Sequence, residues 1–555
     1  MTNSEISDIL ALFAKLMDIH GENSFKIKTY SNASFQIDRL PQQLIDLPKE
    51  HIASIRGIGD SVAKNVHELI ETGKLTQLED LIVKTPEGIL ELMKIKGIGP
   101  KKIATIWHEL GIESPGELLY ACNENRLIHY KGFGEKTQLS IKEALEFYFS
   151  NQQRYLYAQL EPIAHLIEQR LQRLFSHCRV QITGDFVRQC DIINELSFVI
   201  STNDEEIIET LAHEVEFKFD INDNGVLKFL FNNSIHIELH ACDEYTFTET
   251  VFFTTNSPAF NDAFQEYFPE VEFEGNESEE DLFAQAGIEI IEPCLRESAE
   301  IIELAKDNTI PALIQTKDIK GIIHNHSTWS DGAYSIEEMA KACIQKGYEY
   351  LVMSDHSVTS FYANGLSVER ILLQHEEIDR LNEQLKPFKI FKSIECDILG
   401  EGQLDYNDNV LSTFDLVITS IHQNLKMTQE KAMTRLLRAV EHPSTRILGH
   451  PTGRLLLSRK EYPVDFEQLI EACAKHDVVI EINANPRRLD LDWRWIQSAM
   501  KKNVMLSINP DAHSIVGIDD VRYGVLSAQK GMLTKDKNLS SMSLNEFEEF
   551  LKKKK

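Results

Sequence analysis

Nine side chains that can bind metal ions lie in short clusters between residues 321 and 513. Each cluster comes where a hydrophobic run ends, as in GIIHNHSTWSDG. The nine are His324, His326, Asp331, His356, Glu395, His422, His450, Asp511 and His513. Imidazole and carboxylate without cysteine suit two or three divalent ions, such as Mn²⁺, Zn²⁺ or Fe²⁺, with positions left for water. A cluster of this kind activates water at neutral pH and clamps a phosphate.

Three short glycine turns form a second candidate site, in the first 150 residues. They are IRGIGDSVAKNV (55–66), IKGIGPKKIATI (95–106) and YKGFGEKTQLSI (130–141). Glycine allows a tight turn and a close backbone approach, and the helix start that follows directs free N–H groups outward, which favours an anion. Phosphate contacts are therefore expected here, although plain helix connectors are the alternative. The contact residues would be Gly57, Gly59, Gly97, Gly99, Lys101, Lys102, Gly132 and Gly134.

Hydrophobic periodicity predicts the elements that position both sets of residues. Up to residue 150 apolar residues recur at intervals of three and four, which indicates helices. Residues 151–240 begin with a long helical stretch and then alternate as strands, namely VQITGDF, LSFVIS, EFKFDI, VLKFLF and IHIELH. The acidic segment 272–282 is expected to be an exposed loop.

From residue 320 short buried strands alternate with helices. The predicted strands are YEYLVMS, FKIFKSIECDI, FDLVITS, STRILGH, DVVIEINA and VMLSIN, and the helices include MAKACIQKG, one near 367–386, TRLLRAVEH and FEQLIEACAKH. This alternation predicts βα units in a parallel barrel or sheet. The candidate ligands fall at the C-terminal ends of these strands, where such barrels build their sites.

Composition sets the wider limits. With 555 residues the chain is expected to form three or four domains. No run of about 18 apolar residues occurs, so no membrane span is expected. The eight cysteines form no CxxC pair and indicate a reduced, cytosolic protein. Residues 201–320 hold 28 Asp and Glu against 6 Lys and Arg, so this middle part accounts for most of the net charge of −30 and is least suited to hold DNA.

The C-terminal motifs resemble those of the PHP (polymerase and histidinol phosphatase) superfamily over about residues 320–535. HNHSTWSDG, SDHS, IECDI, SIH, GHPTGR, EINANPRRLDL and DAHS occur in the family's order. The resemblance implies a distorted barrel of about seven βα units and a trinuclear metal site. Glu395 is the best candidate to bridge two metals, because a carboxylate has two oxygens to share. Arg454 and Arg459 follow a ligand-bearing loop and are candidates to hold a phosphate, with a structural salt bridge as the alternative. Arg487 and Arg488 are similar candidates.

The glycine turns resemble helix-hairpin-helix motifs, which bind a DNA strand's phosphates, often with a monovalent cation on the loop carbonyls. Together the chain resembles a bacterial family X DNA polymerase with a C-terminal PHP nuclease domain. The resemblance implies a multidomain protein: a helical helix-hairpin-helix region at 1–150 and an α+β nucleotidyltransferase-like palm at 151–240. A thumb-like domain and linker at 241–315 and a distorted (β/α)7 PHP barrel at 316–555 would follow.

The palm segment GDFVRQCDIINELSFVI (184–200) departs from the family pattern. Asp185 stands where the family has a serine, and of two arginines only Arg188 remains. Glu195 and Ser197 occupy the positions of an Asp-x-Asp pair, and His236 occupies the third carboxylate position, with Glu238 nearby. These residues offer too few oxygen ligands for two Mg²⁺ ions. We therefore expect an inactive polymerase site and, because Asn65 stands where the family's lyase lysine is expected, doubtful lyase activity.

The leading hypothesis is a metal-dependent phosphodiesterase of DNA repair, acting as a 3′-5′ exonuclease or in 3′-end processing on gapped or 3′-ended duplexes. It would act in the bacterial cytosol. The sequence gives no indication of a protein partner. One alternative is an active DNA polymerase with a PHP nuclease, in which Glu195 and other acids replace the missing aspartates. Further alternatives are a non-catalytic repair scaffold and a hydrolase of small phosphate esters.

Overall fold

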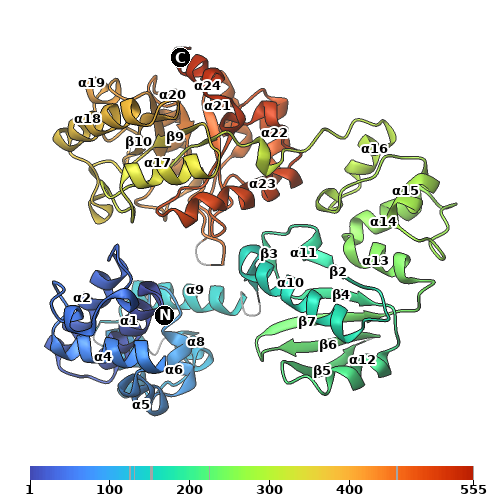
Figure 1. Ribbon diagram of the computed structural model, residues 1–555, viewed down its shortest axis with the longest axis horizontal. Coiled ribbons are helices and arrows are strands. Elements are labelled where there is room, and N and C mark those ends of the chain that lie inside the picture. Colours follow the sequence, from blue (N-terminus) through green and yellow to red (C-terminus); the bar gives the residue numbers. More distant parts are fainter. Residues whose placement is uncertain (124–126, 131, 151–153, 224, 458–459, 554–555) are drawn as a thin grey trace. The chain divides into compact units, whose positions relative to one another are not determined.

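The computed structural model describes residues 1–123, 127–130, 132–150, 154–223, 225–457 and 460–553 (Figure 1). The chain forms two compact units, Met1–Gln152 and Gln153–Lys555. Among the described residues, no helix is long and apolar enough to cross a membrane. Each unit has a hydrophobic core of its own.

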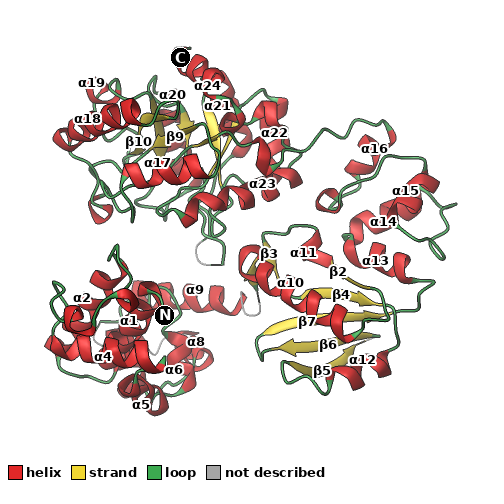
Figure 2. Cartoon of the chain, viewed as in Figure 1, coloured by secondary structure: helices red, strands yellow, loops and turns green. Residues whose placement is uncertain are grey.

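The first unit consists of helices and loops in its described residues (Figure 2). A capping box between Thr2 and Glu5 begins the first helix, whose apolar face carries Leu10 and Phe13 into the core. The α-helices are α1 (Asn3–Ile19), α2 (Ser24–Asp38), α3 (Lys49–Ile52), α4 (Asp60–Thr72), α5 (Thr76–Lys84), α6 (Glu87–Leu92), α7 (Pro100–His108), α8 (Pro115–Asn123) and α9 (Glu135–Ser150).

A five-stranded mixed sheet begins the second unit, with the order β2-β4-β7-β6-β5. Its strands β6 and β7 alternate buried and more exposed residues, as a sheet with one covered face requires. The elements are α10 (Tyr157–Leu174), β2 (Val180–Thr183), α11 (Gly184–Val187), β4 (Leu196–Ile200), α12 (Asp204–Leu211), β5 (Phe217–Asp223), β6 (Val226–Phe231) and β7 (Ile235–Ala241). The short strands β1 (Tyr155–Leu156) and β3 (Ile192–Ile193) pair beside it.

Four helices with a phenylalanine-rich core follow the sheet. They are α13 (Phe247–Thr255), α14 (Pro258–Tyr267), α15 (Glu279–Ala286) and α16 (Glu300–Lys306). The prediction of an exposed loop over residues 272–282 is wrong for the last four residues, because α15 begins at Glu279. There Ser278 and Asp281 form a capping box, which offsets the acidic composition that indicated a loop.

The last part of the second unit is a parallel seven-stranded barrel surrounded by helices, drawn from yellow to red in Figure 1. Its strands are β8 (Gly321–Ile322), β9 (Tyr350–Met353), β10 (Lys389–Asp397), β11 (Leu416–Ser420), β12 (Ile447–Leu448), β13 (Val479–Asn483) and β14 (Leu506–Asn509). The helices are α17 (Ile336–Gln345), α18 (Val368–Gln384), α19 (Asp408–Leu411), α20 (Gln429–Glu441), α21 (Phe466–Lys475), α22 (Ile496–Lys501), α23 (Val521–Lys530) and α24 (Leu544–Lys552).

The barrel is nearly closed where its first and last strands end. The amide of His326 donates to the carbonyl oxygen of Ala512 at 2.9 Å, and Asn325 and Ala512 form a parallel bridge. This contact brings the segment after β8 beside the segment after β14. The predicted fold class is confirmed: a helical N-terminal region, a mixed-sheet region and a distorted seven-stranded parallel barrel.

Candidate metal centre

All nine predicted ligands lie together at the C-terminal end of the barrel. One, Glu395, lies within β10, while the others follow β8, β9, β11, β12 and β14. The side chains of His324, His326 and Glu395 are almost wholly buried, whereas His513 is 41% exposed. A buried polar cluster with one open side can hold ions and still admit a ligand.

The two oxygens of Glu395 face different groups of imidazoles. Oε1 lies 2.9 Å from Nε2 of His450, 3.1 Å from Nε2 of His422 and 3.3 Å from Nε2 of His324. Oε2 lies 2.9 Å from Nδ1 of His356 and 3.7 Å from Nε2 of His326. A carboxylate in this position can be shared between two ions.

The donor set fits a group of divalent ions. Ligand atoms lie within 4.8 Å of one another in three sets: His326 with Asp331, His356 and His513; His324 with His326 and Asp511; and His356 with Glu395 and His422. Ligands about 2.0–2.1 Å from a tetrahedral ion would lie roughly 3.3 Å apart, close to the separations around Glu395. Buried nitrogens of His324, His326 and His356 lack hydrogen-bond partners among the described residues, as metal-ligand atoms would in the ion's absence.

Two carboxylates that the sequence interpretation missed orient the histidines. Oε2 of Glu481 accepts a hydrogen bond from Nδ1 of His324 at 2.6 Å, and Oδ1 of Asp397 accepts one from Nδ1 of His422 at 2.7 Å. Such bonds fix the tautomer and turn Nε2 toward the ion. Asp355, beside His356, accepts hydrogen bonds from Ser327 and Ser330 and so holds the loop after β8.

Burial and neighbouring charges set the protonation of the cluster. Burial lowers the pKa of His326, and the nearby imidazoles of His513 and His356 lower it further, to about 3. Although burial alone disfavours a charged His513, its hydrogen bond to Asp331 and the charge of Asp511 raise the pKa of His513 to about 9. His326 is therefore neutral at pH 7, the form in which imidazole binds a metal.

For Arg454 the structure favours the alternative to phosphate binding, a structural salt bridge. Its guanidinium donates to Oδ2 of Asp492 at 2.6 Å, and Nη2 lies 3.3 Å from Oδ2 of Asp191. The backbone carbonyls of Arg488 and Leu489 accept further hydrogen bonds from it. These acceptors occupy the guanidinium, so it is not available to a substrate. The other predicted arginine, Arg459, lies outside the described residues.

A different arginine, Arg488, faces the ligands. Its Nε lies 3.6 Å from Oδ2 of Asp511, and its side chain is 17% exposed. Its Nη1 is buried and has no hydrogen-bond partner among the described residues. Burial lowers the pKa of His450, and the charge of Arg488 lowers it further. The run RR at 487–488 signalled an arginine here, but not which of the two would turn inward.

The residues of the palm segment are engaged with one another. Asp185 forms an ion pair with Arg188, and Oγ of Ser197 lies 2.9 Å from Nε2 of His240. Burial raises the pKa of Glu195, and the charge of Glu238 raises it further. Glu238, whose charge acts on Glu195, pairs with Ser197 across the sheet. His236 pairs instead with Leu230.

The three glycine turns share one geometry. Gly57, Gly97 and Gly132 have φ of 92°, 95° and 94°, a region that favours glycine. Gly59, Gly99 and Gly134 directly precede α4, α7 and α9, and a Cβ on any of these three would meet open space. Lys101 is exposed, and Nζ of Lys102 lies 3.5 Å from the carbonyl oxygen of Gly97. In α4, Asn65 is buried and donates to the hydroxyl of Tyr30, while Lys64 is exposed.

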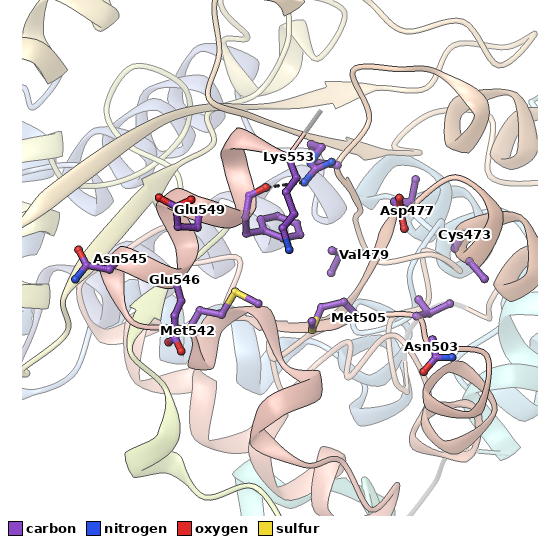
Figure 3. A pocket seen from close by; sticks show the side chains of 15 residues that line it. Cys473, Asp477, Val479, Asn503, Met505, Met542, Asn545, Glu546, Glu549 and Lys553 are labelled. Atoms are coloured by element: carbon purple, nitrogen blue, oxygen red, sulfur yellow. Dashed lines mark hydrogen bonds between the residues drawn. The ribbon is translucent and has the colours of Figure 1, made fainter. Parts of the chain in front are cut away.

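A cavity of about 730 Å³ lies apart from the metal centre. In Figure 3 side chains of α24, among them Glu546 and Glu549, face Asp477 and Asn503 in the segments before β13 and β14. The cavity therefore opens at the N-terminal ends of the strands. The nine candidate ligands lie at the opposite ends, and none of them lines it.

Known families match both ends of the chain. Residues 1–75 match a helix-hairpin-helix domain, residues 89–146 a SAM-like helix-hairpin-helix tandem, and residues 323–485 the PHP domain. The chain is 35% identical over 574 residues to the DNA polymerase/3′-5′ exonuclease PolX of Bacillus subtilis (strain 168), with 100% of both chains covered. A probable phosphatase of Thermoanaerobacter sp. (strain X514) is 25% identical over 249 residues, which cover 42% of this chain and 94% of that protein.

Proposed function

Because the chain belongs to the bacterial PolX family, with helix-hairpin-helix regions and a C-terminal PHP domain, we propose that it acts on DNA as a metal-dependent 3′-5′ exonuclease. The observation that carries this proposal is the buried cluster of nine ligands around Glu395. The glycine turns support a DNA substrate, since their helix starts offer backbone N–H groups to phosphates.

The residues of the cluster would have different roles in the reaction. Two or three divalent ions would supply an activated water molecule and neutralise the scissile phosphate. Glu395 would hold two of them at a fixed separation, because its oxygens face different imidazoles. Glu481 and Asp397 keep His324 and His422 in the tautomer that binds a metal. The buried Nη1 of Arg488 would donate to a phosphate oxygen.

The test is manganese-dependent release of nucleotides from a 3′-recessed duplex. His324→Ala should reduce it by about a hundredfold or more, because it removes a ligand shared by the cluster. His442→Ala is the matched control: this imidazole also lies in the barrel but pairs with Asp408 outside the cluster, so activity should stay at the wild-type level. Unchanged release by His324→Ala would refute the site. A wild-type protein without bound metal or nuclease activity would favour a non-catalytic repair scaffold.

We also propose that the palm segment does not extend DNA. Ser197 offers a hydroxyl where the family has an aspartate, and that hydroxyl is bound to His240. Asp185 is neutralised by Arg188, and Glu195 shares a partly buried site with Glu238. The family relative is named a polymerase as well as an exonuclease, so an active polymerase is the competing function. Incorporation of dNTP into a gapped duplex, abolished by Glu195→Ala, would establish that function and overturn this proposal.

A further inference from the structure

An acidic residue of the palm segment reaches the barrel. Asp191 follows α11 by a few residues, and its Oδ2 lies 3.3 Å from Nη2 of Arg454, which is 263 positions away in the chain. Both side chains are about nine-tenths buried, with 11% and 10% of their surfaces exposed. A buried ion pair holds its partners strongly, because removing one leaves an uncompensated charge.

Arg454 transmits this contact to the backbone that carries Arg488. Its Nε donates to the carbonyl oxygen of Arg488 at 2.8 Å, and Nη2 donates to that of Leu489. The neighbouring amide of Leu456 donates to the carbonyl oxygen of Arg487 at 2.7 Å. The segment after β13 is thus fixed by hydrogen bonds from the loop after β12.

The same loop carries a ligand. Arg454 lies four residues after His450, and between them Thr452 donates to Oδ2 of Asp490 through both its amide and its hydroxyl. Asp492 completes the arrangement by accepting from Nη1 of Arg454. Arg454 therefore ties the loop after β12 to the loop after β13, and Asp191 is the partner that comes from outside the barrel.

We propose that Asp191 is a positioning residue of the nuclease centre: it holds Arg454, which holds the backbone of Arg488 so that its guanidinium meets the substrate phosphate. The inference rests on the proposed nuclease function. It gives the palm segment a role in the barrel's reaction that requires no polymerisation. Because Asp191 acts on Arg488 only through Arg454, its loss should weaken the hold of Arg488 on the substrate phosphate without removing any group that acts on the reacting atoms.

The experiment measures steady-state exonuclease kinetics of the full chain on a 3′-recessed duplex. Asp191→Ala should raise KM about fivefold and change kcat less than twofold, since Arg488 loses its hold on the phosphate. Asp191→Asn, which keeps an acceptor for Arg454, should restore part of the effect. Glu161→Ala is the matched control, because Glu161 also bridges to the barrel but pairs with Arg522 on α23.

A double-mutant cycle with Arg488→Gln separates positioning from general destabilisation. In the Arg488→Gln background, Asp191→Ala should raise KM no further. An equal rise of KM in both backgrounds would overturn the inference, as would an unchanged KM with lower kcat and a lower melting temperature. If Asp191→Ala does not fold, the Asp191→Asn cycle decides by the same criteria. Wild-type chain without nuclease activity would overturn the proposed function and the inference together, whereas normal kinetics of the Asp191 variants beside an active wild type would overturn the inference alone.

Discussion

The ligands could be found from the sequence because each stands where a buried strand ends. Histidine and aspartate directly after runs such as YLVMS and LSIN interrupt an apolar pattern that local structure alone would continue. Glu481 was missed because it lies inside β13, where a charged residue looks like a break in a strand. Asp397 is the last residue of β10, and no local pattern shows that it accepts a hydrogen bond from His422. The sequence left two roles open for Arg454, because its partner Asp191 lies far away in the sequence and no local pattern shows such a pairing.

The first prediction concerns Glu481. Glu481→Gln should weaken metal binding by about ten- to a hundredfold, because a neutral amide holds the Nδ1 proton of His324 less firmly and leaves Nε2 a poorer ligand. The measurement is the competition of the protein with a chelator for Mn²⁺ or Zn²⁺. Glu471→Gln is the control, since that carboxylate pairs with Lys502 at the surface. Equal affinities of wild type and Glu481→Gln would contradict the orienting role.

At the scale of elements, the barrel strands were predictable and their closure was not. Strands β9 and β11 to β14 are wholly buried and β10 is mostly buried, and the helices that alternate with them mark them as parallel. The strand β8 has only two residues, Gly321 and Ile322, and the barrel closes through a single bridge at Asn325. Such a closure depends on backbone hydrogen bonds between distant segments, for which side-chain patterning gives no signal.

The glycine turns permit a prediction that separates backbone strain from contact. Gly97 has φ of 95°, so Gly97→Ala should reduce the local stability of the turn by about 1–2 kcal/mol. Gly99 has φ of −79° and open space at the Cβ position, so Gly99→Ala should leave that stability nearly unchanged. Amide hydrogen exchange in α7 measures both effects. Equal protection in the two variants would contradict the strained-turn geometry.

At the scale of the whole molecule, charge is divided between regions with different tasks. Residues 1–112 carry 15 acidic and 13 basic side chains, a net of −2, whereas residues 201–320 carry a net of −22. The nearly neutral residues 1–112 can approach phosphates through their backbone N–H groups, while the acidic middle repels them. The total charge of −30 therefore does not argue against DNA binding, because the distribution of charge along the chain determines which regions can approach phosphates.

The last prediction concerns the effect of metal removal on the thermal stability of the two units. Removal of metal with a chelator should lower the melting temperature of the second unit by several degrees and leave that of the first unchanged, because ions that bind only the folded barrel stabilise it. A free metal concentration of about a hundred times Kd would add about 2.7 kcal/mol to the free energy of unfolding. Differential scanning calorimetry of the full chain measures both transitions. In His324→Ala the chelator effect should shrink, and an undiminished shift there would place the stabilising ion outside this cluster.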